Sequence, residues 1–163
     1  MQESSPPLPA GFLRHPVHVL ALGFGAGCVP RLPGTMGTLV GVVIYILCRN
    51  LPAPWFIAGV VMMIAAGIWI CGRTAADLAV HDHPAIVWDE IAGYLAAMAV
   101  APQGWLWVIA GFFLFRLFDI WKPWPIAALD RKVPGGLGIM LDDLAAAAYT
   151  LIVIQIIAYL LVR

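Results

Sequence analysis

Long apolar segments, separated by short breaks rich in proline and glycine, restrict what this chain can fold into. Of its 163 residues, 63% are hydrophobic and 11% are charged, whereas about half of the residues in a typical soluble domain are apolar. A soluble core of this size could not bury so much apolar surface. The hydropathy and the lengths of the apolar runs therefore predict a single all-α, polytopic membrane helix bundle.

The chain is expected to consist of a short tail and one domain. Residues 1–12 are polar and proline-rich, and they lack the basic region followed by an apolar stretch that marks a signal peptide. We predict that they form a disordered N-terminal tail. Residues 13–163 are predicted to form one membrane-embedded domain.

The apolar runs predict four or five transmembrane spans. With five spans, the crossings are about 36–49, 55–71, 86–101, 104–118 and 137–162. Residues 13–29 end in a glycine-rich stretch, so whether they cross the bilayer, re-enter it or lie at its surface remains open.

Charged residues are distributed unequally between the two sides of this arrangement. The N-terminal side would carry seven basic residues, Arg14, Arg31, Arg73, Arg116, Lys122, Arg131 and Lys132, and the other side two, Arg49 and Arg163. This asymmetry places the N-terminal side in the cytoplasm. The acidic residues from Asp77 onward fall on that same side. The formal net charge of zero provides no basic surface for nucleic acid.

Acidic residues stand in three groups at the ends of apolar runs, Asp89-Glu90, Asp119 and Asp142-Asp143, with Asp82 just upstream of the first group. A carboxylate near membrane depth is costly, which favours a functional role. Carboxylates that converge repel one another unless a divalent cation lies between them, and an all-oxygen ligand set suits Mg²⁺ or Mn²⁺ better than Zn²⁺. The alternative is that these acids lie at helix starts, stabilised by the helix dipole and by basic neighbours.

Basic side chains accompany the second acidic group. Arg116, Asp119 and Lys122 are spaced by three residues, which places them on one face of a helix. Arg116 and Lys122 could contact a phosphate group. Carboxylates, a metal ion and cations together are typical of phosphoryl transfer, in which positioning and charge stabilisation dominate.

Two further segments are weaker candidates. The glycine-rich loop 23–38 leads into a helix and could hold an anion, with Arg31 and Thr35 as donors, although glycines also serve helix packing. His81 and His83 flank an aspartate and could bind metal or carry a proton, or they could belong to a turn at the membrane interface. Of the two histidines, His83 is the better candidate.

Five blocks of sequence closely resemble the phosphatidylglycerophosphatase A family. They are residues 23–27, 33–38, 81–90, 115–125 and 135–143, and the resemblance extends over most of the chain from about residue 17. It implies a Mg²⁺-dependent multi-pass enzyme of the bacterial inner membrane, with its active site facing the cytoplasm. The expected reaction removes the terminal phosphate of phosphatidylglycerophosphate and gives phosphatidylglycerol and inorganic phosphate.

The resemblance also implies which residues in or beside the matching blocks form the site, and the division of roles among them is our inference. The expected metal ligands are Asp89, Glu90, Asp119, Asp142 and Asp143, and the same residues apart from Glu90 are expected to be catalytic. Arg31, Arg116 and Lys122 are expected to contact the substrate phosphate, together with Thr35. Either a carboxylate or His83 would accept the proton of an attacking water.

Other classes of membrane protein remain as alternatives. A lipid phosphotransferase of the CDP-alcohol type also uses carboxylates and a divalent metal, but its Asp-Gly-x-x-Ala-Arg signature is absent here. An ion-coupled transporter would place its acids near mid-span, whereas these acids gather towards one end. The expected partner is a phospholipid substrate. The oligomeric state and the number of metal ions are left open.

Overall fold

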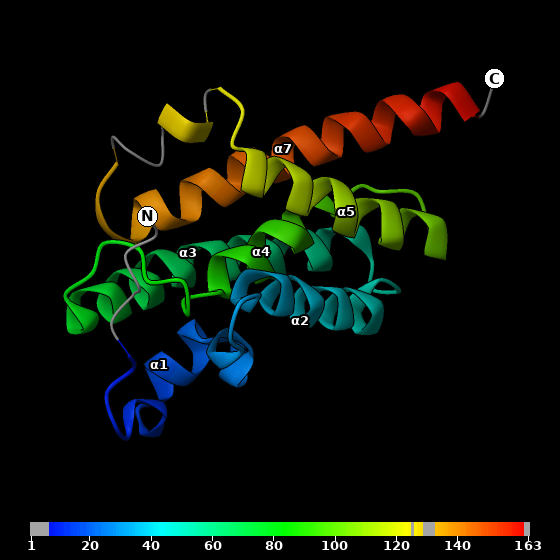
Figure 1. The fold of residues 1–163 in the computed structure, drawn as a ribbon. Helices are drawn as coiled ribbons and strands as arrows, with labels where there is room; N and C mark the ends of the chain where they lie inside the picture. Colours follow the sequence, from blue (N-terminus) through cyan, green and yellow to red (C-terminus); the bar gives the residue numbers. More distant parts are fainter. Residues whose placement is uncertain (1–6, 125, 129–132, 162–163) are drawn as a thin grey trace.

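The computed structural model describes residues 7–124, 126–128 and 133–161. Within these residues all regular structure is helical, which confirms the predicted all-α class (Figure 1). The elements are η1 Phe12–Arg14, α1 Pro16–Ala21, η2 Gly23–Cys28, α2 Pro33–Cys48, α3 Ala53–Leu78, α4 Trp88–Ala97, α5 Trp105–Trp121 and α7 Gly135–Leu161. Residues 1–6 of the predicted tail, and the charged residues Asp130, Arg131, Lys132 and Arg163, lie outside the described residues.

Helix α4 lies at the centre of the bundle, where it packs against α2, α3, α5 and α7 (Figure 1). Ile91, Ala92 and Tyr94 are fully buried. The Tyr94 hydroxyl donates a hydrogen bond of 3.1 Å to the carbonyl of Val108 and so ties α4 to α5. A central helix surrounded in this way is apolar on nearly every face, which explains why its sequence reads as a membrane span.

Two helices, α3 and α7, are long and apolar enough to cross a membrane, and α2 is a shorter apolar helix. Large apolar side chains cover much of the outer surface, including Val43, Met62 and Phe113. These features indicate membrane association. Helix α4 has ten residues, or about 15 Å of length, which is half the ~30 Å of a bilayer core. The predicted number of four or five spans therefore stays a prediction.

Helix α3 continues beyond the predicted span 55–71. The polar segment after this span has the i,i+4 spacing of a helix at Arg73 and Asp77, and span and segment form one helix that ends at Leu78. The chain leaves that helix through Ala79, whose φ of 53° is left-handed. Helix α5 ends similarly at Lys122, with φ of 45°. Both changes of direction occur at the end of the bundle where α2, α4 and α7 begin.

Helices α3 and α7 cross with their backbones in direct contact. A Cβ added to Gly136 would overlap the carbonyl oxygen of Ile68 and would lie 2.6 Å from the amide nitrogen of Gly72. A Cβ on Gly67 would lie 2.6 Å from the sulfur of Met140. Small residues permit this close approach, which is the usual basis of helix association in membranes.

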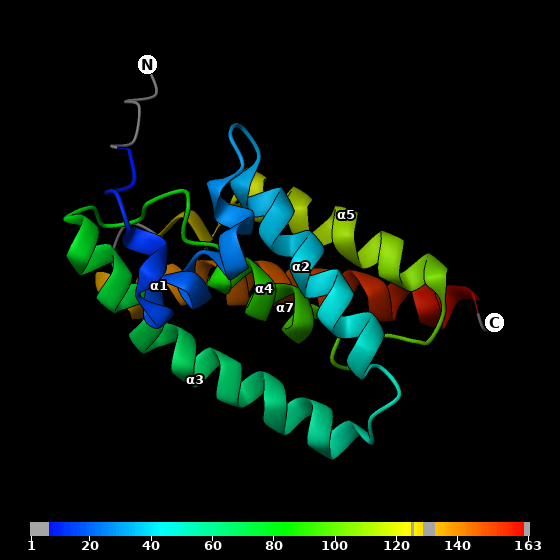
Figure 2. The same ribbon diagram turned by 90° about the horizontal axis from the view of Figure 1, so that it is seen from below.

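Residues 16–28 form a bridge at one end of the bundle, because α1 packs on α3 while η2 packs on α2 (Figure 2). The amide of Val87 donates to the carbonyl of Ala21 across 2.9 Å and joins this bridge to the start of α4. The chain kinks at Phe24 and Gly25, which have positive φ. No helix in this segment is long enough to cross a bilayer.

His18 holds the bridge against α3. Its Nδ1 lies 3.0 Å from the Thr74 hydroxyl and its Nε2 lies 3.4 Å from Asp77 Oδ2. The ring of Phe12 stacks on the imidazole at 3.9 Å. Burial lowers the pKa of His18, and the charges of His15 and Arg73 act in the same direction while Asp77 opposes them.

We expect Gly136→Ala to destabilise the protein by about 1–3 kcal/mol or more, because the new methyl group meets backbone atoms that cannot move aside. Gly59→Ala on α3 is the matched control, since no atom lies within 4 Å of its added Cβ; it should gain about 0.5–1 kcal/mol from helix propensity. Thermal unfolding in detergent measures both. Equal stabilities would contradict the backbone contact.

The docking of residues 16–28 should weaken as the pH falls below 6.5, the ordinary pKa of histidine. The detached segment binds a proton at His18 more readily than the docked segment, so stability rises with pH in this window. Hydrogen exchange of residues 17–22 between neutral pH and about pH 5 measures the effect. His18→Gln should remove it, and His81→Gln, at an exposed position, should not. Persistence of the pH dependence in His18→Gln would refute the assignment.

Candidate active site

The predicted acidic groups meet at one end of the bundle, where α2, α4 and α7 begin and α5 ends (Figure 1). We call this the acidic end. Asp89 and Glu90 occupy the first turn of α4. Asp142 and Asp143 lie in the second turn of α7, and Asp119 lies in the last turn of α5. Three stretches distant in sequence therefore supply carboxylates to one region.

Asp89, Glu90 and Asp143 form the centre of this region, and we call them the carboxylate trio. Each offers an oxygen that lies within 4.8 Å of the oxygens of the other two. Asp143 is 2% exposed and Asp89 is 7% exposed. Within the described part of the chain, Asp89 Oδ1, Glu90 Oε2 and Asp143 Oδ2 are buried without a hydrogen-bond partner. Buried carboxylate oxygens that face one another in this way fit an oxygen-coordinated divalent cation.

A glycine allows the two helices of the trio to approach. A Cβ added to Gly93 would lie 3.2 Å from Cβ of Asp143 and 2.9 Å from the ring of Phe115. Gly93 thus lets α7 come close to α4. Any larger residue at this position would push α7 away from α4 and separate Asp143 from the other carboxylates.

Basic side chains pair with the two remaining acids. Arg116 forms the expected i,i+3 ion pair with Asp119, and its Nη1 also lies 4.0 Å from Glu90 Oε1. Lys122 Nζ donates a 2.6 Å hydrogen bond to Asp142 Oδ2. Asp119 and Asp142 are thus partly neutralised next to the trio, which explains how so many acids can share one site.

These ion pairs bear on the two interpretations of the acidic groups, a metal site or acids stabilised by helix dipoles and basic neighbours. Asp119 and Asp142 fit the structural alternative, because each is held by a basic partner. Glu90 faces Arg116 only at the limit of ion-pair distance, and one of its oxygens has no hydrogen-bond partner among the described residues. The helix-dipole alternative therefore explains the outer acids better than it explains the trio.

The start of α2 forms another wall of the site. A Cβ on Gly34 would overlap Glu90 Oε1 and would lie 3.0 Å from Arg116 Nη1. Thr35 follows in the same turn and is half-buried, whereas Arg31 is exposed on the preceding turn with φ of 74°. The predicted anion loop therefore reaches the acidic end through Gly34, which the sequence analysis did not single out. A glycine directly after the proline of a helix start was the available signal.

The His81–His83 segment lies beside the same end. His83 is 4% exposed, and its Nδ1 accepts a 3.1 Å hydrogen bond from the amide of Ala85. Asp82, grouped with these acids but not predicted as a site residue, interacts electrostatically with Asp89. Its position seven residues before Asp89, across a turn, was the signal in the sequence.

Known proteins match most of this chain. A family model described as Phosphatidylglycerophosphatase A matches residues 19–158. A protein of Escherichia coli (strain K12) with that name is 47% identical over 135 residues, covering 82% of this chain and 78% of the relative. A protein of Haemophilus influenzae with the same name is 43% identical over 155 residues, covering 94% and 95% of the two chains.

A third relative carries a different name. A "Putative phosphatidylinositol-3-phosphatase" of Bacteroides thetaiotaomicron is 36% identical over 146 residues, covering 85% of this chain and 91% of the relative. No solved structure gives a significant match.

Gly34→Ala tests the wall formed by α2. The added methyl group would displace the ends of two side chains, Glu90 and Arg116, rather than backbone, so folding should persist while the trio is disturbed. We expect Mn²⁺ binding, measured by electron paramagnetic resonance, to weaken roughly tenfold or more, as for other residues that orient metal ligands. Gly59→Ala serves again as the control. Unchanged Mn²⁺ affinity in Gly34→Ala would contradict this placement.

Proposed function

This chain belongs to the phosphatidylglycerophosphatase A family, and we propose that it hydrolyses phosphatidylglycerophosphate to phosphatidylglycerol and inorganic phosphate at the acidic end. It is a lipid phosphatase by its match over residues 19–158. The single observation that carries the chemistry is the carboxylate trio: its members offer oxygens within 4.8 Å of one another, and each has one buried oxygen without a hydrogen-bond partner among the described residues.

We propose that Asp89, Glu90 and Asp143 hold Mg²⁺. Their donor atoms are all carboxylate oxygens, which suit this ion, and their mutual repulsion favours a cation between them. When bound, the ion would stabilise charge on the phosphoryl oxygens and lower the pKa of a water molecule. Asp119 and Asp142, at the edge of the trio, would keep the ligands oriented or complete the ligand set.

Arg116 and Lys122 are proposed to bind the phosphate. Arg116 Nε is buried and has no hydrogen-bond partner among the described residues, so this donor is available while Nη1 stays with Asp119. Lys122 brings an ammonium group to the edge of the trio, where its Nζ lies 2.6 Å from Asp142 Oδ2. The first turn of α2, at Gly34 and Thr35, brings backbone amides and the helix dipole to the same side.

A carboxylate is the proposed acceptor of the proton from the attacking water. In neutral His83 the hydrogen bond from Ala85 occupies Nδ1, which leaves the proton on Nε2. In that form the Nε2–H of His83 can donate a hydrogen bond, but the ring has no free lone pair to accept a proton. We therefore assign the proton to a carboxylate at the edge of the trio, Asp142 or Asp119, and a donor role to His83.

We propose that the protein is a multi-pass protein of the bacterial inner membrane, with the acidic end facing the cytoplasm. Arg73, Arg116 and Lys122 lie at or beyond that end, and Arg49 is the basic residue of the opposite end among the described residues. We keep the proposal of five spans. In it, α4 and residues 98–104 form one crossing, which the other helices surround. The chain goes from Trp88 at the acidic end to Trp105 at the other.

Phosphate release from phosphatidylglycerophosphate in mixed micelles tests the proposed site. We expect Asp143→Asn to lower the rate about a hundredfold or more, because the substitution removes a charged ligand from the trio. EDTA should abolish the activity and added Mg²⁺ should restore it. Asp77→Asn is the matched control, since this acid on α3 pairs with Arg73 and lies outside the trio.

Three outcomes would contradict parts of this proposal. Full activity of a folded Asp143→Asn variant would exclude the trio as the metal site. Activity that survives EDTA would exclude the metal. A higher kcat/KM for phosphatidylinositol 3-phosphate than for phosphatidylglycerophosphate would assign the chain to the substrate that names the third relative.

A further inference from the structure

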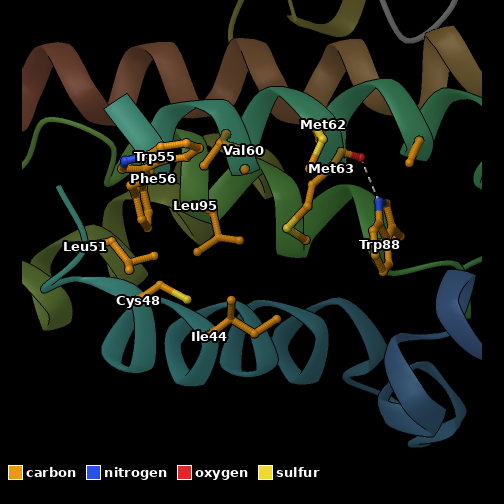
Figure 3. A pocket seen from close by; sticks show the side chains of 12 residues that line it. Ile44, Cys48, Leu51, Trp55, Phe56, Val60, Met62, Met63, Trp88 and Leu95 are labelled. Carbon is orange, nitrogen blue, oxygen red and sulfur yellow. Dashed lines mark hydrogen bonds between the residues drawn. The ribbon is translucent and has the colours of Figure 1, made fainter. Parts of the chain in front are cut away.

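Away from the acidic end, a groove runs between α2 and α3 and is floored by α4 (Figure 3). Its volume is about 390 Å³, within the range of ligand pockets. The lining side chains carry no charge and include Ile44, Trp55, Val60, Met63 and Leu95. Helices α2 and α3 do not pack extensively against each other, so the groove is a true gap between them.

A second, smaller cavity of about 240 Å³ adjoins the groove at the end of the bundle opposite the acidic end. Leu51 and Phe56 line both cavities. The smaller cavity differs in character, because Tyr45, Arg49 and Gln103 contribute polar groups to its wall. The apolar groove therefore leads to a polar pocket whose wall includes the guanidinium of Arg49.

The groove has the dimensions of one acyl chain in one leaflet. Its lining on α3 extends from Trp55 to Ala66, which corresponds to about 17 Å of helix. This length is about half of the ~30 Å hydrocarbon core of a bilayer. An acyl chain that entered the groove at the end of the bundle opposite the acidic end would reach Trp88. The indole N–H of Trp88 donates a hydrogen bond to the carbonyl of Met63, and this contact closes the groove.

Charge at this end favours an anionic head group. Arg49 lies over the ring of Trp105 at 5.2 Å, which holds the guanidinium near the expected membrane interface. Trp55 and Trp105 are both largely exposed, at 73% and 58%, as expected for interfacial anchors. Among the described residues no acid lies at this end, so Arg49 has no carboxylate competitor for a phosphate group.

We propose that the two cavities together bind an anionic phospholipid of the leaflet opposite the acidic end. Its phosphate contacts Arg49 and Gln103, and one acyl chain fills the groove between α2 and α3. The site is separate from the catalytic one: Trp88 precedes Asp89 in sequence, but its side chain faces α3, and no member of the trio lines either cavity. The bound lipid completes the packing that α2 and α3 lack.

Spin-labelled lipids test this site on the full-length protein in bilayers of phosphatidylcholine. The probes are phosphatidylserine and phosphatidylcholine, each with a nitroxide on one acyl chain. We expect the unmodified protein to restrict more of the phosphatidylserine probe. Arg49→Gln should reduce that preference about fivefold, the effect of one basic residue at a membrane surface. Gly59→Trp should reduce the restricted fraction of both probes, because the open space at Gly59 lines the groove.

Matched variants control for charge and bulk. Val61→Trp adds the same side chain to α3 at an exposed position that lines neither cavity, and Arg14→Gln removes an exposed charge elsewhere; neither should change the spectra. Equal restriction of the two probes by the unmodified protein would overturn the proposal. The proposal would also be overturned if the Gly59→Trp variant kept the restricted fraction of both lipid probes but changed its particle mass in light scattering. A second copy of the chain would then occupy the groove.

Discussion

Mutual repulsion among buried carboxylates is the constraint on which this structure depends. Burial makes the charged form of Asp89, Glu90 and Asp143 less stable than it would be in water. Repulsion between the three carboxylates raises this cost further. The bundle nevertheless encloses them at the meeting point of α4 and α7. Such a site persists because surrounding packing holds it, and in the proposed function the free energy that folding loses there would become affinity for a cation and, through it, for a phosphate ester.

The packing that holds the trio comes from backbone contacts more than from large side chains. Gly93 sets the distance between α4 and α7, Gly34 places the start of α2 on Glu90, and Gly136 joins α7 to α3. Each contact lies at or near the acidic end. Helices whose backbones touch have few alternative positions, so ligands carried by different helices are held at fixed separations. The opposite end, with its open groove, has no such requirement.

Much of this arrangement could be predicted from the chain. Apolar runs identified the helical bundle, and the acids at their ends identified the residues that meet. The segment after Cys71 has the i,i+4 spacing of a helix at Arg73 and Asp77, but its full continuity with α3 could not be predicted, because a polar segment after an apolar span can equally begin a separate helix. Nor could the division of the acids be predicted: Lys122 reaches Asp142 because its left-handed φ turns the chain there, which no helical spacing reveals.

The trio also has a consequence for the order in which the protein assembles during synthesis. Asp89 and Glu90 are translated 53 or more residues before Asp143 completes the cluster. Until α7 emerges, α4 has neither its main packing partner nor the glycine contact that encloses its acids. A helix with two carboxylates costs several kcal/mol in lipid. We therefore expect the acids of α4 to be enclosed only after α7 has been synthesised, so that a chain truncated before α7 would leave them without their cover.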